Sequence, residues 1–362
     1  MRPRRGWAVG VNEVAANVRN VSMALDGAVS VSMSPHPFYQ FTYDHVLPSR
    51  IRWRWARYLV RIIYSPLLLG YLCHRVDGFF YVAGSGYLLN ELDGRAREFR
   101  FLKSRGRKIV CFFCGSEIRS LRLMSQLSKA LDRDLISTYQ TIAIPGFDAD
   151  HLDVFRRKLA ASADAYADHI FNASVDQICY LRRSVHPFMY FFPDSGFRRS
   201  DEKFQSMRRI RILHGPSSPL IKGTPLVRAA IKKLKLEGYD FEYQELVGVS
   251  NQMVLQALAD AHIVLNEFYA LVPGQFGVEA MATHCALMTS ADERIETSLP
   301  SGSNSAWMVT EYWNIYDNLK QLLDEPRLII QYANAGFEWA SEHCSQGKNA
   351  RRLERLLSNL PA

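Results

Sequence analysis

The sequence lacks any apolar run that is long enough to cross a bilayer. Its most apolar window, residues 58–72, is interrupted by Arg61 and Pro66 and falls short of the roughly 20 residues that a membrane-spanning helix needs. The basic first residues are not followed by the apolar stretch and small-residue cleavage site of a secretory signal. We therefore expect a cytoplasmic protein, at most peripheral to the inner face of the membrane.

Cysteine is too thinly spread to form a disulfide framework or a cysteine-based metal site. Six cysteines are scattered through 362 residues, mostly within apolar runs, which favours a reducing compartment. Cys111 and Cys114 form a C-x-x-C pair at the end of an apolar run, but no second pair stands at the spacing of a zinc site. We interpret the pair as structural and predict no metal.

The start of the chain lacks the three glycines of the dinucleotide-binding fingerprint. Residues 7–11 and 29–33 are typical of strands, and residues 14–25 carry apolar side chains at a roughly helical spacing. Only Gly10 stands at the first turn of this βαβ pattern, where the fingerprint would place its glycines. We therefore predict no NAD site here.

The charge is uneven along the chain. The length suits two domains of about 150 to 200 residues each. Residues 1–200 hold 28 Lys and Arg against 17 Asp and Glu, whereas the remaining residues hold 16 against 19. A basic first half indicates an anionic partner such as a phospholipid surface, a phosphorylated acceptor or nucleic acid, or simply a soluble basic face.

Residues 50–75 concentrate this positive charge beside apolar residues. Arg50, Arg52, Arg54, Arg57 and Arg61 are interleaved with aromatic residues, as in a helix that lies on an anionic bilayer. The alternative is an ordinary buried helix with a solvated arginine face. No RNA-binding motif accompanies the segment, so we predict no nucleic-acid partner. The aromatic residues in question are Trp53, Trp55 and Tyr58.

A polar loop follows the apolar run at 108–113. It contains Cys114, Gly115, Glu117 and Arg119, and polar loops at strand ends are where α/β domains place chemistry. The alternative is that Glu117 and Arg119 only cap and pair at the start of a helix. The other elements expected in the first half are strands at 76–82 and 168–171 and helices at 90–105, 151–163 and 174–181.

The domain boundary is predicted in the polar, aperiodic stretch 195–207. This divides the chain into a first domain at 1–200 and a second at 201–362. It leaves open whether the last helices cross back to the first domain.

The stretch 208–291 alternates short β-branched runs with amphipathic runs. Strands are predicted at 210–213, 241–247 and 263–265, and each is followed by a loop and a helix. The three strand-to-helix junctions should therefore lie along one edge of a parallel sheet, where such sheets bind ligands.

Two of these junctions carry groups that suit a nucleoside diphosphate. Lys222 follows a Ser/Pro loop, and Gly274 to Gly277 open a helix whose free N–H groups and positive dipole end attract phosphate. Glu279 follows in the first turns, where a carboxylate suits the vicinal hydroxyls of a ribose better than a diphosphate. The alternatives are a solvated lysine and an ordinary helix N-terminal charge.

These residues also resemble a known family. The stretch from His214 to Thr224, then 259–264 and 274–282, is similar to the donor domain of GT-B glycosyltransferases of the large retaining group four. The similarity is clearest over 208–345 and weaker over 75–200. It implies an α/β protein with two Rossmann-like domains facing a cleft, the GT-B architecture.

The resemblance implies roles for individual residues. The enzyme would transfer a hexosyl group from a UDP- or GDP-sugar to a glycan or lipid-linked acceptor in surface polysaccharide or glycoconjugate biosynthesis, without metal or tightly bound cofactor. Lys222, Glu279 and Glu117 would be catalytic. The donor would be held by Ser217, Ser218, Lys222, Val247, Gly274, Gln275, Phe276, Gly277 and Glu279. The acceptor side would hold Gly10, Gly84, Cys114, Gly115 and Arg119.

The sequence departs from the family pattern at three positions. Leu271 replaces the usual glutamate eight residues before Glu279, Ser217 replaces an arginine, and Cys114 replaces a histidine that contacts the sugar. A non-catalytic nucleotide-binding or scaffold protein is therefore the alternative function. A nucleotide-sugar epimerase or a phosphorylase of similar architecture is a third interpretation.

Overall fold

Two parallel β-sheets organise the chain, which confirms the predicted α/β class. The chain forms two compact units, a first of Met1–Leu123, Asp148–Phe191 and Asn349–Ala362, and a second of Met124–Phe147 and Phe192–Lys348. The predicted boundary near residue 200 itself stays a prediction. The computed structural model describes residues 6–33, 38–39, 41–46, 53–205 and 207–360.

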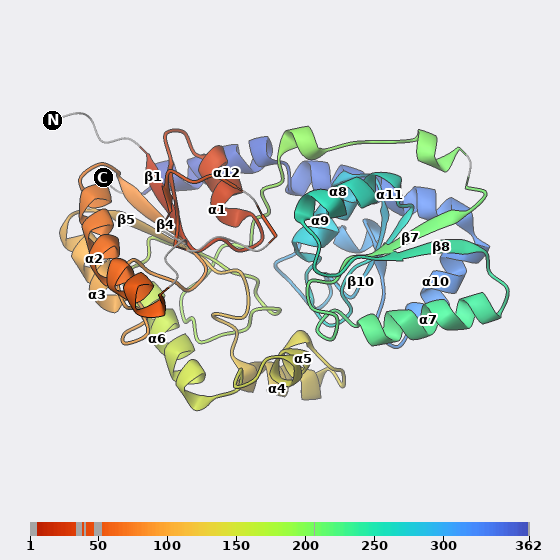
Figure 1. Cartoon of the computed structure of the whole chain (residues 1–362), viewed down its shortest axis with the longest axis horizontal. Helices are drawn as coiled ribbons and strands as arrows, with labels where there is room; N and C mark the ends of the chain where they lie inside the picture. The colour runs from red at the N-terminus through yellow and green to blue at the C-terminus, as the bar shows by residue number, and fades with distance from the viewer. Residues whose placement is uncertain (1–5, 34–37, 40, 47–52, 206, 361–362) are drawn as a thin grey trace. The chain divides into compact units, whose positions relative to one another are not determined.

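The sheet of the first unit has the strand order β3-β2-β1-β4-β5-β6, with all pairs parallel (Figure 1). This is the order of a doubly wound Rossmann sheet. The strands are β1 (Trp7–Val11), β2 (Val29–Ser32), β3 (His45–Val46), β4 (Gly78–Val82), β5 (Lys108–Phe112) and β6 (His169–Phe171). The helices are α1 (Asn17–Ala24), α2 (Arg54–Cys73), α3 (Ala96–Ser104), α6 (Asp150–Tyr166) and most of α12 (Gln346–Ser358).

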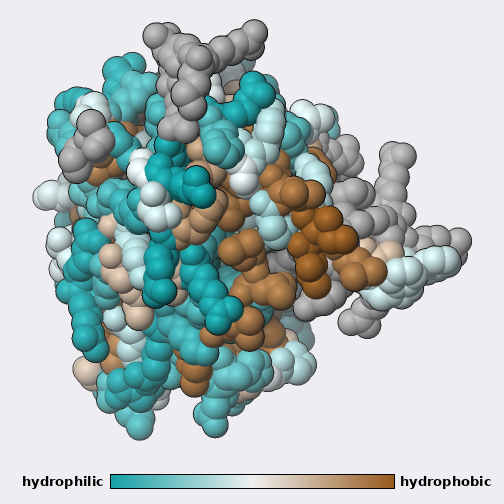
Figure 2. Space-filling view, turned by 90° about the vertical axis from the view of Figure 1, so that its left-hand side faces the viewer, coloured by the Kyte–Doolittle hydropathy of each residue, from teal (hydrophilic) through white to brown (hydrophobic). Residues whose placement is uncertain are grey.

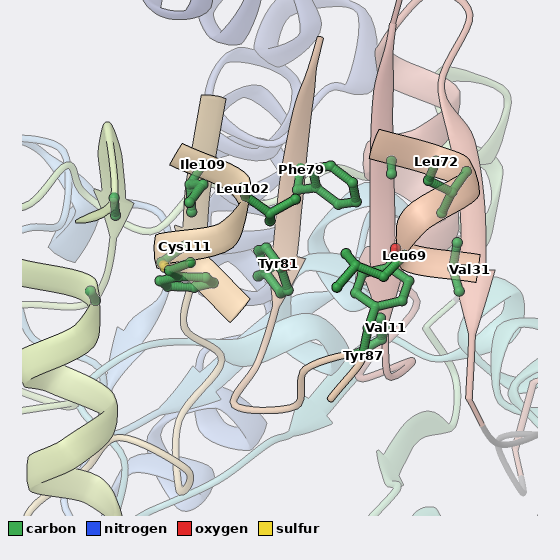
Figure 3. Packing of buried hydrophobic residues seen from close by; sticks show 14 of the residues in the cluster. Val11, Val31, Leu69, Leu72, Phe79, Tyr81, Tyr87, Leu102, Ile109 and Cys111 are labelled. Carbon is green, nitrogen blue, oxygen red and sulfur yellow. The ribbon is translucent and has the colours of Figure 1, made fainter. Parts of the chain in front are cut away.

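Helices cover both faces of this sheet, so every residue of β4 is buried. Phe79 and Tyr81 pack on one face against α2, α3 and α6, and Figure 3 shows them beside Leu69, Leu72 and Leu102. Phe80 and Val82 alternate to the other face, where α1 and the α12 residues Leu353 and Leu357 cover them. The end of the chain therefore completes the core of the first unit.

The second sheet has the order β11-β10-β9-β7-β8, again with parallel pairs. Its strands are β7 (Ile210–His214), β8 (Phe241–Glu245), β9 (Ile263–Leu265), β10 (Ala286–Thr289) and β11 (Met308–Val309). Its helices are α5 (Ile136–Ala143), α7 (Thr224–Leu236), α8 (Asn251–Asp260), α9 (Gly274–Ala282), α10 (Ile315–Asp324), α11 (Pro326–His343) and most of α4 (Leu121–Ala130). Short 3-10 turns lie at Asp194–Gly196, Glu202–Phe204 and Ser303–Ser305.

The predicted helix at 174–181 is wrong, because side chains hold this segment in an irregular loop. The Arg119 guanidinium donates to both the carbonyl and the carboxylate of Asp176, each at 2.6 Å. The Asn172 amide donates to the carbonyl of Gln177 at 3.1 Å. These bonds occupy the carbonyl acceptors of a helix, so tertiary contacts override the local pattern.

The helix expected at 90–105 begins only at Ala96. The two carboxylate oxygens of Asp93 accept hydrogen bonds from the backbone N–H groups of Arg95 and Arg97, at 3.1 and 3.0 Å. A carboxylate that satisfies the first free N–H groups marks the start of a helix. None of the helices in the described part of the chain is long and apolar enough to span a membrane.

Candidate functional site

The loop after β7 delivers Lys222 to the carboxyl edge of the second sheet. Gly223 adopts a left-handed conformation with φ 79°, which turns the chain into α7 directly after the lysine. The Lys222 ammonium forms an ion pair with the Glu267 carboxylate, whose side chain is only 5% exposed. The lysine is therefore held at this edge rather than free in solvent.

His214, at the end of β7, holds this loop through two hydrogen bonds. Its Nδ1 donates to the carbonyl of Leu265 at 2.7 Å, so its Nε2 accepts from the Thr224 hydroxyl at 2.9 Å. Burial lowers the pKa of His214 to about 4, which keeps the imidazole neutral. His214 thus fixes the start of α7 against β9 and does not add positive charge.

Glu267 is a candidate site residue that the sequence reasoning missed. It lies two residues after the end of β9, and its carboxylate contacts Lys222. A Cβ added at Gly274, which has φ 62°, would lie 2.7 Å from the Glu267 Oε1 atom. The sequence feature that could have identified it is an acidic residue just after an apolar strand. It lies four residues before Leu271, the position at which the family pattern has a glutamate. Leu271 itself is fully buried.

The start of α9 packs closely on the loop that precedes it. A Cβ at Gly277 would meet the Asn266 Nδ2 atom at 2.9 Å, so glycine is needed here for packing. The Asn266 amide in turn donates to the carbonyl of Pro273 at 2.6 Å. This contact fixes the first turn of α9, and with it the positive end of the helix dipole, at the sheet edge.

Glu279 lies in the second turn of α9, because the helix begins at Gly274. It is buried and accepts a hydrogen bond from the Asn251 side chain at 3.0 Å. Burial raises the pKa of Glu279 to about 7, against the opposing hydrogen bonds from Asn251 and Gln275. The carboxyl group therefore joins α9 to the start of α8, and Asn251 is a second residue that the sequence reasoning missed.

The remaining donor-side candidates lie in the first turn of α9 or in loops at the same edge. Phe276 packs on Gly215, where an added Cβ would be 2.9 Å from the ring. Val247, in the loop after β8, is 46% exposed. The Ser218 carbonyl accepts from the Lys222 N–H at 3.1 Å, and Ser217 is exposed. The donor-side candidates thus form separate small groups of contacts. Lys222 contacts Glu267, Glu279 contacts Asn251 and Gln275, and Phe276 contacts Gly215.

The candidates of the first unit gather at the carboxyl ends of β1, β4 and β5. The Glu117 carboxylate accepts from the N–H of Cys114 at 2.5 Å, and a Cβ at Gly84 would be 3.1 Å from the Glu117 Cβ. The Asn17 amide approaches the Cys114 sulfur at 3.7 Å. Burial raises the pKa of the Cys114 thiol, so the thiol stays protonated.

The other first-unit candidates have structural contacts. Arg119 forms a buried ion pair with Asp176 at 2.6 Å, and Gly115 lies beside its guanidinium with φ 149°. A Cβ at Gly10 would be 2.6 Å from the Val31 carbonyl oxygen. These contacts, with the hydrogen bond that the Cys114 N–H donates to Glu117, fix the loops at this edge of the first sheet. Within the described residues, no group of three or more His, Cys, Asp or Glu side chains could hold a metal ion.

No protein-family model and no curated protein sequence matches the chain. Solved structures do match. Sucrose-phosphate synthase from Thermosynechococcus elongatus has a TM-score of 0.61 at 12% identity, covering 98% of each chain. WaaG, a glycosyltransferase involved in lipopolysaccharide biosynthesis, has 0.56 at 10%, covering 98% of this chain and 100% of its own. An α-glucosyltransferase solved with UDP and DNA has 0.55 at 11%, covering 98% of each chain. The chain therefore has the GT-B glycosyltransferase fold.

Proposed function

We propose that this protein is a retaining glycosyltransferase that moves a hexosyl group from a nucleotide diphosphate sugar to a glycan or lipid-linked acceptor. The observation that carries the proposal is the carboxyl edge of the second sheet, where Lys222 pairs with Glu267 and where Glu279 is buried between α9 and the start of α8. The donor is a UDP- or GDP-sugar, and the acceptor belongs to surface polysaccharide or glycoconjugate biosynthesis. Catalysis uses neither metal nor tightly bound cofactor.

The leaving diphosphate is stabilised by charge. The Lys222 ammonium and the positive dipole end of α9 both lie at the carboxyl edge of the second sheet, and positive potential there favours the charge that develops as the sugar departs. Because Glu267 already pairs with Lys222, the diphosphate competes with that carboxylate for the ammonium. Donor binding therefore requires Lys222 to be shared or released by Glu267.

The nucleoside is held through Glu279. Its buried carboxyl group accepts hydrogen bonds and lies where α8 and α9 begin and meet. Ribose hydroxyls are suitable donors to such a group, and Val247 in the exposed loop after β8 is available to the base. Asn251, which already donates to Glu279, orients the carboxylate.

The acceptor is bound by the first unit, at the carboxyl ends of its strands. The partly exposed Cys114 and Glu117 face the acceptor, and the buried Gly10, Gly84, Gly115 and Arg119 shape the loops around them. Cys114 is a protonated thiol and makes a weaker hydrogen bond than the histidine of the family pattern. Sugar transfer is therefore expected to depend mainly on Lys222, Glu279 and the start of α9, which bind the donor, and on holding donor and acceptor together.

A nucleotide screen tests the donor site first. Thermal unfolding is measured with UDP, GDP, ADP and CMP, and the preferred diphosphate should stabilise the protein by about 2.7 kcal/mol at a hundredfold excess over its Kd. Matching nucleotide sugars are then incubated with glycan and lipid-linked acceptors while free nucleotide and sugar product are followed.

The product identifies the activity. Release of nucleotide with a glycosylated product supports transfer, whereas a converted nucleotide sugar indicates an epimerase. Nucleotide binding without any turnover identifies the non-catalytic alternative. A folded protein that binds none of the four nucleotides contradicts the proposal.

A further inference from the structure

Helix α2 is apolar on two opposite faces. Leu68, Leu69 and Leu72 are at most 5% exposed and pack into the core of the first unit. On the other side, large apolar side chains stand in solvent, and Figure 2, which views the side of the unit that carries α2, shows a brown hydrophobic patch. The exposed side chains of this region are Trp53, Trp55, Leu59, Ile62, Ile63, Leu67 and Tyr71, with exposures of 65, 61, 46, 39, 60, 68 and 47%.

The spacing of these residues makes one surface. Trp55, Leu59, Ile63, Leu67 and Tyr71 follow one another at intervals of four residues, so they form a stripe along the helix. A helix on the surface of a soluble protein normally presents polar side chains to water. An exposed apolar stripe of this length therefore marks a surface that binds something.

A groove continues the stripe toward the loop after β4. Its volume is about 260 Å³, and it is lined by Ile62 and Pro66 of α2 and by Leu88, Leu89 and Leu92 of the loop. Ile62, which lines the groove and is 39% exposed, is next in sequence to Ile63 of the stripe, and Leu92 is itself 62% exposed. The apolar surface thus includes a hollow wide enough for part of a hydrocarbon chain.

The charge around this surface decides which partner it fits. Residues 50–75 contain six arginines and no acidic residue. At the end of α2, Arg75 lies over the Tyr71 ring at 5.1 Å and donates to its hydroxyl at 2.7 Å. Arg97, with a side chain 78% exposed, lines the groove beside Asp93, with which it pairs at 3.7 Å, and the buried Glu98. Arg50 and Arg52 lie outside the described residues, as do the side chains of Arg54, Arg57, Tyr58 and Arg61.

We propose that the α2 stripe and its groove dock on an anionic phospholipid bilayer. The helix lies in the plane of the interface, its apolar stripe enters the acyl region, and the groove receives part of one acyl chain. Tryptophan and tyrosine rings prefer the boundary between headgroups and hydrocarbon, and arginines attract anionic headgroups. The surface belongs to the first unit alone, so this proposal does not rest on glycosyl transfer.

Vesicle flotation of the full chain tests the proposal. Vesicles of phosphatidylcholine are compared with vesicles that also contain phosphatidylglycerol, and binding should be strong only to the anionic ones and weaken with salt. The double variant Ile63→Glu, Leu67→Glu should partition into anionic vesicles about tenfold less than the parent, or weaker still. Leu236→Glu, at an 80% exposed leucine of the second unit, is the matched control and should float like the parent.

Two further measurements separate docking from misfolding and from self-association. The double variant should keep the unfolding temperature and the nucleotide response of the parent, because both leucine and isoleucine side chains are exposed. Tryptophan fluorescence should be quenched by brominated lipid in the parent and less so in Trp55→Phe.

Equal flotation of parent and double variant, or no binding of the parent to anionic vesicles, overturns the proposal. So does a parent dimer in solution that the double variant dissociates, since the face would then bind a second copy.

Discussion

At the scale of single residues, the candidate donor site is defined by two buried carboxyl groups with different partners. Glu267 faces a cation, whereas Glu279 faces only amides. The same residue type is therefore held in two electrostatic environments at one sheet edge. This difference makes the roles of the two residues experimentally separable.

We expect Lys222→Gln to lose most of the stabilisation by nucleoside diphosphate. The substitution removes the charge that attracts phosphate, so affinity should fall about tenfold or more. It also leaves Glu267 buried without its cation, so the unliganded variant should unfold more easily. The measurement is the shift in unfolding temperature that the nucleotide causes within each variant.

Lys232→Ala is the control for this prediction, because Lys232 is an exposed lysine of α7, the helix that follows Lys222. A nucleotide-induced shift in Lys222→Gln as large as in Lys232→Ala would remove Lys222 from the donor site.

We expect Glu279→Gln to change how stability depends on pH. The pKa of Glu279 is raised to about 7, so the folded protein holds a proton that the unfolded chain loses near pH 4.5. This stabilises the fold at low pH, and the benefit is lost as the pH rises through 7. Between pH 5 and pH 8 the parent should therefore lose roughly 3 kcal/mol of unfolding free energy through this group. Glu279→Gln should not show this loss, because glutamine does not titrate. Urea unfolding at both pH values measures this, and parallel pH profiles of parent and variant would contradict it.

At the scale of elements, strands form where the hydrophobic pattern of the sequence predicts them and tertiary packing favours the same structure. Residues 7–11, 210–213 and 263–265 were predicted as strands, and β1, β7 and β9 confirm them. The predicted helix at 174–181 failed because Arg119, remote in the sequence, and the nearby Asn172 bind its carbonyl groups. Periodicity reports only local preference, so it cannot reveal such contacts.

The loop at 174–181 should depend on the buried pair of Arg119 and Asp176. Arg119→Ala leaves a buried carboxylate without its cation, and we expect a loss of about 3 to 5 kcal/mol of unfolding free energy. Arg122→Ala, at an exposed arginine three residues away, should change it by less than about 0.5 kcal/mol. Urea unfolding of both variants checks this, and equal stability would show that the ion pair does not hold the loop.

The first turn of α9 should not tolerate a larger residue at Gly277. A methyl group there would lie 2.9 Å from the Asn266 amide and 3.0 Å from Pro273, so Gly277→Ala should cost about 1 to 3 kcal/mol. Gly70→Ala in α2 is the contrasting substitution, because nothing lies within 4 Å of its added methyl group. It should be neutral or stabilise by up to about 1 kcal/mol. Thermal unfolding measures both, and a Gly277→Ala variant as stable as Gly70→Ala would contradict the packing argument.

At the scale of the whole molecule, the two units are not continuous in sequence. Residues 349–362 belong to the first unit, and 124–147 belong to the second. In the first unit, the Leu356 carbonyl lies 3.1 Å from a ring nitrogen of His169, and Leu353 is fully buried against the sheet. The C-terminal helix is therefore part of a core that otherwise comes from the first half of the chain.

A fragment ending at residue 200 should consequently not fold stably. It lacks the α12 side chains that cover Phe80 and Phe112, and it would expose that apolar face. Within the full chain, Leu353→Ala should cost about 2 to 5 kcal/mol, whereas Glu354→Ala at the exposed neighbouring position should be nearly neutral. Circular dichroism of the fragment and urea unfolding of the variants test this, and a cooperatively folded fragment 1–200 would refute it.

The sequence by itself determined the α/β class and the positions of Lys222, the α9 glycines and Glu279, because strand ends, helix starts and glycines leave local patterns. Only the tertiary structure decided that Glu267 pairs with Lys222, that Asn251 binds Glu279 and that α12 completes the first unit. It also decided that α2 keeps an exposed apolar stripe as well as a buried one. These features join residues far apart in the chain, and hydrophobic periodicity does not distinguish a side chain buried in the core from one that stands in solvent.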